Sequence, residues 1–405
     1  MDQYNSIQFS SNCCLYGYDT INLLGKRIAH YGTHALLISD RTVLDKVQPL
    51  VEKALIDANI ICYWMVMSGY CSKINIEKAV CLGKDFSADI VVGVGGGRVL
   101  DTAKIVAHQL QLNLVTMPTS AATCAAASLL AVEYTDEGKQ IGDYWPQHTP
   151  ALTLIDWNII LRNCPVRYNV SGMLDAMAKY PEISFHYLND KSLQENPIFC
   201  FGYRTSKEAY EFFLKHGKHA VQEMQSQNIG KMAEYAAFIS ISLTGLISCL
   251  AFGGQQAALA HLICYYLTNH YPEVVSNWLH GEIVGAALLY QLAVNGSSQE
   301  ECNSLKSFLS FVGAPFSLKE LSYKPSKTEK QGLITFLVDK FNITNGDLHV
   351  SLIENQSILL GEIIEIQYFF CYSSIKHDFF TNIGNVIIAS SKVALSPVAG
   401  GGDLI

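Results

Sequence analysis

The chain has 405 residues, a formal net charge of −8 and 16% charged residues, so it is long enough for two domains with large cores. The acidic balance and the lack of basic runs interleaved with aromatic residues exclude a typical nucleic-acid-binding protein. The 12 cysteines are scattered and the start lacks a signal-like pattern, so we expect a cytoplasmic protein with reduced thiols. The apolar run 238–252 is too short and too rich in serine for a membrane span, and we expect no membrane partner.

Strand and helix patterns alternate between about residues 15 and 165. Short apolar runs predict strands at 34–39, 60–67, 88–94, 112–117 and 151–155. Stretches such as 43–58 and 74–85 predict helices between them. This alternation is typical of a parallel sheet with helices on both faces, so we predict an α/β nucleotide-binding domain over 1–165.

Helical periodicity dominates after Pro165, where the strand signals vanish. The pattern predicts helices at 206–216, 230–249, 255–268, 281–295 and 328–340. We therefore predict an all-α helical domain over 166–366. Residues 367–405, which are first aromatic and then β-prone, form a C-terminal extension of unknown role.

The segment ADIVVGVGGGRVLDTAK, residues 88–104, joins a buried-strand run to a helical pattern through Gly95, Gly96 and Gly97. Glycines at such a junction let backbone N–H groups approach a phosphate at the positive end of a helix. Arg98 stands where the third glycine of a dinucleotide fingerprint would fall, and the segment is not a Walker loop. A tight structural turn is an equally good explanation of the glycines alone.

Several residues near this junction have both a functional and a structural interpretation. Asp40 closes the strand HALLISD, where a carboxylate can accept hydrogen bonds from ribose hydroxyls or cap the next helix. Asp101 and Lys104 follow the glycines and belong either to a solvated helix face or to a cofactor or substrate contact. The small residues of 118–128 allow close approach of a ligand or a tight contact between sheet and helix.

Three residues of the helical half are candidates for one metal site. Asp175, His261 and His280 each lie in an apolar helical pattern, where a polar group is costly unless it is paired or ligating. A carboxylate with two imidazoles leaves the open position that a catalytic zinc needs. Their spacing along the chain does not bring them together, and hydrogen-bonded core histidines remain the alternative.

Four segments together resemble the glycerol-dehydrogenase branch of the iron-containing alcohol dehydrogenase and dehydroquinate-synthase-like superfamily. They are GVGGGRVLDTAK, TMPTSAATCAAASLLAVEYTDEG, PVRYNVSGMLDAMAKY, and the pair ALAHLICYYLT and LHGEIVGAALLYQL. The resemblance covers about residues 10–366. It implies an NAD-binding N-terminal domain, a helical C-terminal domain, a metal in the cleft between them and an enzyme acting on CH–OH groups. We also expect a homo-oligomer.

The resemblance assigns roles to individual residues. It implies that Asp175, His261 and His280 are metal ligands and that Asp40 binds the adenosine ribose. Further cofactor contacts are expected at Gly95, Gly96, Gly97, Arg98, Asp101, Lys104, Thr119, Ser120, Ser128, Leu130 and Tyr134.

Three departures from the family pattern bear on specificity. Arg98 replaces the more usual Ser or Lys, so NAD is expected while NADP stays open. Cys124 stands where glycerol dehydrogenases carry a substrate-contacting Asp, and AATCAA instead resembles hydroxycarboxylate dehydrogenase A. Lys179 replaces the His that iron-type enzymes show four residues after the metal Asp, so zinc is expected rather than iron.

These observations predict metal-assisted hydride transfer between NAD(H) and a small hydroxy acid, 2-oxo acid or polyol. Lys179 is expected to bind a substrate carboxylate or to lower the pKa of the alcohol. The alternatives are glycerol dehydrogenase proper, a phospho-sugar lyase or phosphopolyol dehydrogenase of the superfamily, and a silent relative that only binds. A lyase needs several cations for a phosphate, and this region offers Lys104, Lys179 and Arg167.

Overall fold

The computed structural model describes residues 9–344, so the predicted extension 367–405 and the end of the predicted helical domain lie outside the described residues. The chain divides into two compact units, one of residues 1–295 with 300–323 and the other of residues 296–299 with 324–405. The predicted boundary at residue 165 falls inside the first unit. The described part of the second unit contains α14 (Lys327–Thr344).

A six-stranded parallel sheet forms the N-terminal part of the first unit, in the order β1-β8-β5-β4-β2-β3. Its strands are β1 (Cys14–Gly17), β2 (His34–Asp40), β3 (Ile61–Met67), β4 (Ile90–Gly95), β5 (Asn113–Pro118) and β8 (Leu152–Asp156). The predicted parallel sheet and its five predicted strands are therefore confirmed. The sequence reading missed β1, which has four residues and little buried surface, and the antiparallel hairpin of β6 (Ala131–Tyr134) and β7 (Gln140–Tyr144).

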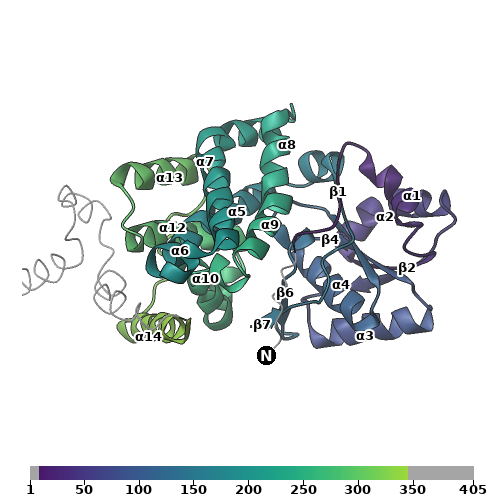
Figure 1. Ribbon diagram of the computed structural model, residues 1–405, viewed down its shortest axis with the longest axis horizontal. Helices are drawn as coiled ribbons and strands as arrows, with labels where there is room; N and C mark the ends of the chain where they lie inside the picture. The colour runs from purple at the N-terminus through teal and green to yellow at the C-terminus, as the bar shows by residue number, and fades with distance from the viewer. Residues whose placement is uncertain (1–8, 345–405) are drawn as a thin grey trace, which may run out of the picture. The chain divides into compact units, whose positions relative to one another are not determined.

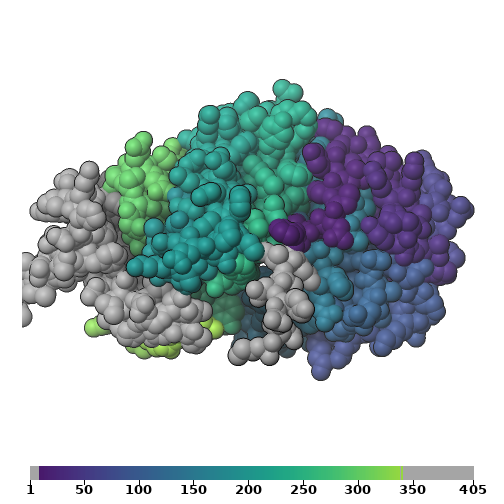
Figure 2. Space-filling view, viewed as in Figure 1, coloured from purple at the N-terminus to yellow at the C-terminus, as the bar shows by residue number. Residues whose placement is uncertain are grey.

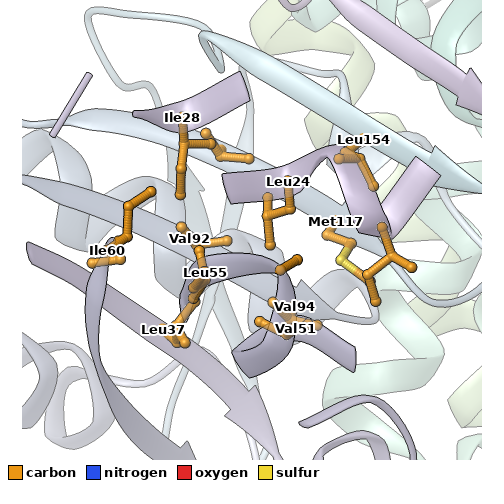
Figure 3. Close-up of a cluster of buried hydrophobic side chains, with 14 of the residues drawn as sticks. Leu24, Ile28, Leu37, Val51, Leu55, Ile60, Val92, Val94, Met117 and Leu154 are labelled. Carbon is orange, nitrogen blue, oxygen red and sulfur yellow. The ribbon is translucent and has the colours of Figure 1, made fainter. Parts of the chain in front are cut away.

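Helices cover both faces of the sheet (Figure 1). α1 (Leu24–Ile28) and α2 (Arg41–Ile56) pack on one face, where Leu37 and Val92 point, as Figure 3 shows. α3 (Lys73–Asp85) and α4 (Gly97–Leu110) pack on the other face, against Leu36 and Ile38. Successive strand residues point to opposite faces, so a sheet buried on both sides needs the continuous apolar runs seen in the sequence.

Helices make up the rest of the first unit. They are α5 (Val166–Asn189), α6 (Lys191–Glu195), α7 (Pro197–Ser226), α8 (Lys231–Phe238), α9 (Thr244–Leu250), α10 (Leu259–His270), α11 (Pro272–Val275), α12 (His280–Val294) and α13 (Gln299–Val312). No strand follows Asp156 within residues 9–344, which confirms the predicted α/β part followed by a helical part. The predicted helix 255–268 begins later, at Leu259, because Gly253 has a φ of 70° and residues 254–256 form a short 3-10 turn.

The segment Lys231–Leu250 is the one helical stretch within the described residues that is long and apolar enough to cross a membrane by length and composition. It is 67% buried, as the core helix of a globular protein is. Its middle, residues 239–243, is a π-helical turn between α8 and α9.

Close backbone contact joins the helical part to the sheet. A Cβ on Gly172 of α5 would lie 1.6 Å from the carbonyl oxygen of Ala121, in the loop after β5, so glycine is required there. Asn169, one turn earlier, accepts a hydrogen bond from the Ala121 N–H (3.0 Å) and donates to the carbonyl of Ile160 (2.8 Å). In Figure 2 the purple-to-blue N-terminal part accordingly lies directly against the teal helical part.

Candidate active site

Three helices bring the predicted metal ligands together. Asp175 lies in the middle of α5, His261 in the first turn of α10, and His280 at the start of α12. The N–H of Gly281 donates to Ser171 Oγ (3.1 Å), and a Cβ on Gly281 would lie 1.8 Å from the Ser171 carbonyl oxygen. This contact holds the start of α12 against α5, one turn before Asp175.

The three side chains form a compact donor set. Asp175 Oδ1 lies 3.1 Å from His261 Nε2 and 3.7 Å from His280 Nε2, and all three ligand atoms lie within 4.8 Å of one another. Ligand atoms about 2 Å from one tetrahedral ion are about 3.3 Å apart, so these residues fit a single divalent ion. Asp175 is buried while the His280 side chain is 46% exposed, which leaves one side of the cluster accessible.

Lys179 lies within the same cluster, one helical turn after Asp175. Its Nζ is 3.6 Å from Asp175 Oδ1 and 3.3 Å from His261 Nε2, and its side chain is 5% exposed. Burial alone would raise the pKa of Asp175, but Lys179 and the two histidines hold the pKa of that carboxyl well below its usual range. Desolvation likewise opposes the charge of Lys179, but the surrounding acidic groups, with Asp175 the largest contributor among them, together outweigh it and raise the pKa of Lys179.

Glu182 is a site residue that the sequence analysis missed. It lies seven residues after Asp175 on α5, is fully buried, and contacts Nδ1 of His261 through Oε2. Its Oε1 accepts hydrogen bonds from the N–H groups of Ala258 and His261, both at 2.8 Å. The signal was present, because Asp175, Lys179 and Glu182 follow helical spacing in an otherwise apolar pattern.

The two histidines have different surroundings. Desolvation lowers the pKa of His261, but the charge of Glu182 and the hydrogen bonds to Asp175 and Glu182 together outweigh it and raise the pKa overall. Desolvation lowers the pKa of His280 to about 4, and its Nδ1 lies 3.4 Å from Cys264 Sγ. His280 is therefore neutral near pH 7, which is the form of imidazole that binds a metal.

Cys124 opens a short 3-10 turn, residues 124–126, in the loop that follows β5. Desolvation and the nearby charge of Asp175 raise the pKa of its thiol to about 11. The thiol is therefore uncharged near neutral pH.

The predicted cofactor residues gather at the carboxyl edge of the sheet. Asp40 ends β2, Gly95 ends β4, and Thr119 and Ser120 follow β5; these three strands are neighbours. The N–H of Thr119 donates to the Gly95 carbonyl (3.2 Å). Ligands of open parallel sheets bind at this edge, so the placement suits a nucleotide.

Asp40 also has a structural role. Its Oδ1 accepts a hydrogen bond from the N–H of Val43 (3.0 Å), which caps α2. The capping role raised in the sequence analysis is thus present, and ribose binding stays a prediction.

Four of the predicted cofactor residues contact one another in the interior. The Lys104 ammonium lies 3.2 Å from Asp101 Oδ1 and 3.2 Å from Ser128 Oγ, and it also donates to the Leu130 carbonyl. Asp101 Oδ2 accepts from the N–H of Val132 (3.3 Å), at the start of the hairpin β6–β7. Both charged side chains are at most 10% exposed, so this group ties α4 to the hairpin. Their cofactor roles stay predictions.

The Arg98 side chain contacts the loop that follows β3. Its Nη1 donates to the Gly69 carbonyl (3.2 Å), and its guanidinium lies 5.1 Å from the centre of the Tyr70 ring. Tyr70 in turn packs against Tyr134, with ring centres 5.5 Å apart. Arg98, Tyr70 and Tyr134 therefore form one group of packed side chains.

Arg167 is engaged in holding α12. It makes two hydrogen bonds of 2.7 Å to Glu282, whose Oε2 accepts from the N–H of Leu279 (2.8 Å) at the start of that helix. Of the three cations considered for a phosphate, Lys104 and Arg167 thus have structural partners.

Comparison with known proteins places these residues in context. Residues 12–157 match the iron-containing alcohol dehydrogenase family. The chain is 28% identical to a glycolaldehyde reductase of Halobacterium salinarum, over 78% of this chain and 85% of that protein. It is also 28% identical to a glycerol dehydrogenase of Pseudomonas putida, over 75% of this chain and 82% of that protein. Hydroxycarboxylate dehydrogenase A of Escherichia coli is 29% identical, over 57% of this chain and 62% of that protein.

The fold has a counterpart among solved structures. The crystal structure of glycerol dehydrogenase from Schizosaccharomyces pombe superimposes with a TM-score of 0.72 at 23% identity, covering 83% of this chain and 84% of that one. The predicted architecture, an α/β sheet domain followed by a helical one, is thus confirmed.

Proposed function

Because the chain belongs to the iron-containing alcohol dehydrogenase family, in the group that includes the glycerol dehydrogenases, we propose that it transfers a hydride between NAD(H) and a small hydroxy acid or 2-oxo acid. Family membership makes it an oxidoreductase of CH–OH groups; the cofactor, metal and substrate are the proposal. The observation that carries it is the cluster of Asp175, His261 and His280, with Lys179 beside it.

Asp175, His261 and His280 would hold one divalent ion. Such an ion supplies Lewis acidity to the oxygen of an alcohol or a carbonyl. Zinc is favoured over iron for two reasons. Two nitrogens and one oxygen suit a tetrahedral zinc site, and Lys179 stands where iron-type enzymes carry a histidine.

The residues around the cluster are suited to an anionic substrate. Lys179, which is 5% exposed and paired with Asp175, supplies a positive charge beside the cluster that would attract a substrate carboxylate. Cys124 is uncharged, whereas an Asp at its position would repel a carboxylate. Together they favour a hydroxy acid over a neutral polyol such as glycerol.

The sheet edge is suited to NAD. The turn Gly95–Gly97 offers backbone N–H groups at the start of α4 for the pyrophosphate. The Asp40 carboxylate lies at the end of β2, where it favours ribose hydroxyls and disfavours a 2′-phosphate.

The lyase alternative has less support than the sequence suggested. A phosphate-bearing substrate needs several free cations, and Arg167 and Lys104 are committed to Glu282 and Asp101. Lys179 lies beside the cluster and is itself paired with Asp175.

A substrate panel tests the proposal. The metal-free protein is loaded with zinc or with iron(II), and reduced nicotinamide is followed by absorbance with 2-hydroxy acids, 2-oxo acids, glycerol and glycolaldehyde. We expect net NAD turnover with zinc and the highest kcat/KM for a monocarboxylate. Alanine replacements of Asp175, His261 and His280 are each expected to abolish bound metal and activity. Stoichiometric metal retained by all three variants, or no nicotinamide turnover on any substrate, contradicts the proposal.

A further inference from the structure

Glu182 is a buried carboxylate to which the proposed chemistry assigns no task. Its side chain is completely inaccessible, and it shares one face of α5 with Asp175 and Lys179. Burying a carboxylate is costly unless all of its hydrogen-bonding capacity is used. Its partners therefore indicate what it does.

One oxygen of Glu182 caps α10. The N-cap residue of that helix is Ala258, which has no side-chain acceptor. Glu182 Oε1 instead accepts from the N–H groups of Ala258 and His261, and Gln291 Oε1 accepts from Leu259 (2.8 Å). Two other helices thus satisfy the first-turn donors of α10, and a negative charge at this end is also favoured by the helix dipole.

The other oxygen, Oε2, contacts Nδ1 of His261. An ionised carboxylate only accepts hydrogen bonds, so Nδ1 carries the proton. The ring nitrogen that faces Asp175 and Lys179 is Nε2, at 3.1 and 3.3 Å. The nitrogen left free by this tautomer is therefore the one in the donor set.

We propose that Glu182 is a positioning residue that fixes the His261 ring as the Nδ1–H tautomer and thereby sets the affinity of the cluster for a divalent ion. The inference rests on the proposed function, because it takes Asp175, His261 and His280 as the metal site. Among the described residues, the hydrogen-bond partner of His280 Nδ1 is the Cys264 sulfur, which is a weak one. His261 is accordingly the more firmly oriented of the two imidazoles.

The variant Glu182→Gln tests this in the full-length protein. Glutamine has the same size, and its single oxygen still caps α10, while its NH₂ group then faces His261 Nδ1. Nδ1 must then accept a hydrogen bond from this NH₂ group, so the ring proton moves to Nε2. We expect the zinc affinity, measured by competition with a chelator, to fall about 10- to 100-fold, as it does when other carboxylates that accept from a metal-bound histidine are replaced.

Gln291→Met is the matched control. It removes the acceptor for the N–H of Leu259, in the first turn of the same helix, but leaves the His261 ring and Glu182 in place. We expect its thermal unfolding temperature to fall while its zinc affinity stays within about twofold of wild type. An equal loss of zinc affinity in Gln291→Met and Glu182→Gln would mean that Glu182 acts only as a helix cap, and would overturn the inference.

A spectroscopic measurement detects the protonated ring nitrogen of His261 in the wild-type protein itself. In zinc-loaded wild-type protein with ¹⁵N-labelled histidine, the His261 signal, assigned by its loss in His261→Ala, should show a protonated Nδ1 and a zinc-bound Nε2. Zinc bound through Nδ1 overturns the inference, as does wild-type zinc affinity in Glu182→Gln. If Asp175→Asn also binds zinc as wild type does, the proposed metal site itself fails; if only Glu182→Gln does, the site stands and this inference fails.

Discussion

Asp175, Lys179, Glu182 and His186 follow one another along α5 at spacings of four, three and four residues, so a single helix face carries four buried polar groups. Asp175 belongs to the cluster, and Lys179 and Glu182 contact His261 in it. His186 Nε2 lies 2.8 Å from the Ala257 carbonyl, next to the start of α10. For individual residues, the burial of these polar side chains in an apolar helix is explained by their partners on neighbouring elements.

Lys104 is expected to be structural. In Lys104→Met, Asp101 keeps its buried charge without its ammonium partner, so the free energy of unfolding should fall by about 3–5 kcal/mol. Denaturant unfolding measures this, and Lys104→Met/Asp101→Asn should recover part of the loss. Unchanged stability with a raised KM for NAD would instead assign Lys104 to the cofactor.

Asp40 is expected to set cofactor choice through its charge. Asp40→Gly should narrow the kcat/KM ratio between NAD and NADP, because the carboxylate no longer repels a 2′-phosphate. Asp40→Asn separates this effect from helix capping, since asparagine keeps the cap to Val43 and removes the charge. Both variants should therefore narrow the ratio, and equal use of NAD and NADP by the wild type would contradict the assignment.

Cys124 is expected to make the enzyme prefer hydroxy acids over glycerol-like diols as substrates. Cys124→Asp places a negative charge near Asp175 and should shift the kcat/KM ratio toward glycerol-like diols and away from hydroxy acids by on the order of tenfold, about 1.4 kcal/mol. Cys124→Ser, which stays neutral, should keep the preference for acids. A wild type that oxidises glycerol far better than every hydroxy acid tested would refute this account of the pocket.

At the scale of elements, glycines adjacent to the ligands decide how closely the helices approach. Gly172 lies three residues before Asp175 and meets Ala121, and Gly281 directly follows His280 and meets Ser171. The same contacts therefore position α5 against the loop that carries Cys124 and α12 against α5.

Gly172→Ala should disturb this arrangement. Its Cβ would meet the Ala121 carbonyl, so helix and loop must separate, at an expected loss of about 1–3 kcal/mol in unfolding free energy. Gly142→Ala in β7 is the control, because a Cβ there meets no atom within 4 Å. Thermal unfolding of both variants checks the prediction, and equal stability would contradict it.

At the scale of the molecule, the cluster joins three helices of the first unit, with Asp175 from α5, His261 from α10 and His280 from α12. A bound ion would therefore act as a cross-link within the helical part.

Metal removal should consequently lower stability. A ligand that binds only the folded state at 100 times its Kd adds about 2.7 kcal/mol, so chelation should reduce the unfolding temperature and zinc should restore it. His280→Ala should not respond to zinc. A wild-type unfolding temperature that is unaffected by chelator and by zinc would contradict a metal site in the folded protein.

The strands in the interior of the sheet could be predicted from local patterns in the sequence. The buried runs at β2, β3, β4, β5 and β8 read correctly because parallel strands covered on both faces are apolar throughout. The exposed edge strand β1 and the hairpin β6–β7 carry no such run, and they were missed. The candidate metal residues stood out because a lone polar group in an apolar helix needs a partner.

The partners of these polar residues could not be predicted from the sequence, because they lie on other helices. In the sequence, His261 follows Asp175 by 86 residues, and His280 follows His261 by 19 residues. The spacing of residues within one helix does not indicate which other helices pack against it. The structure also paired Lys104 with Asp101 and Arg167 with Glu282, and it placed Glu182 on His261. The spacing of residues along a helix determines which face each side chain lies on. Which neighbouring element packs against that face depends on tertiary contacts, such as that between Gly172 of α5 and Ala121 in the loop after β5.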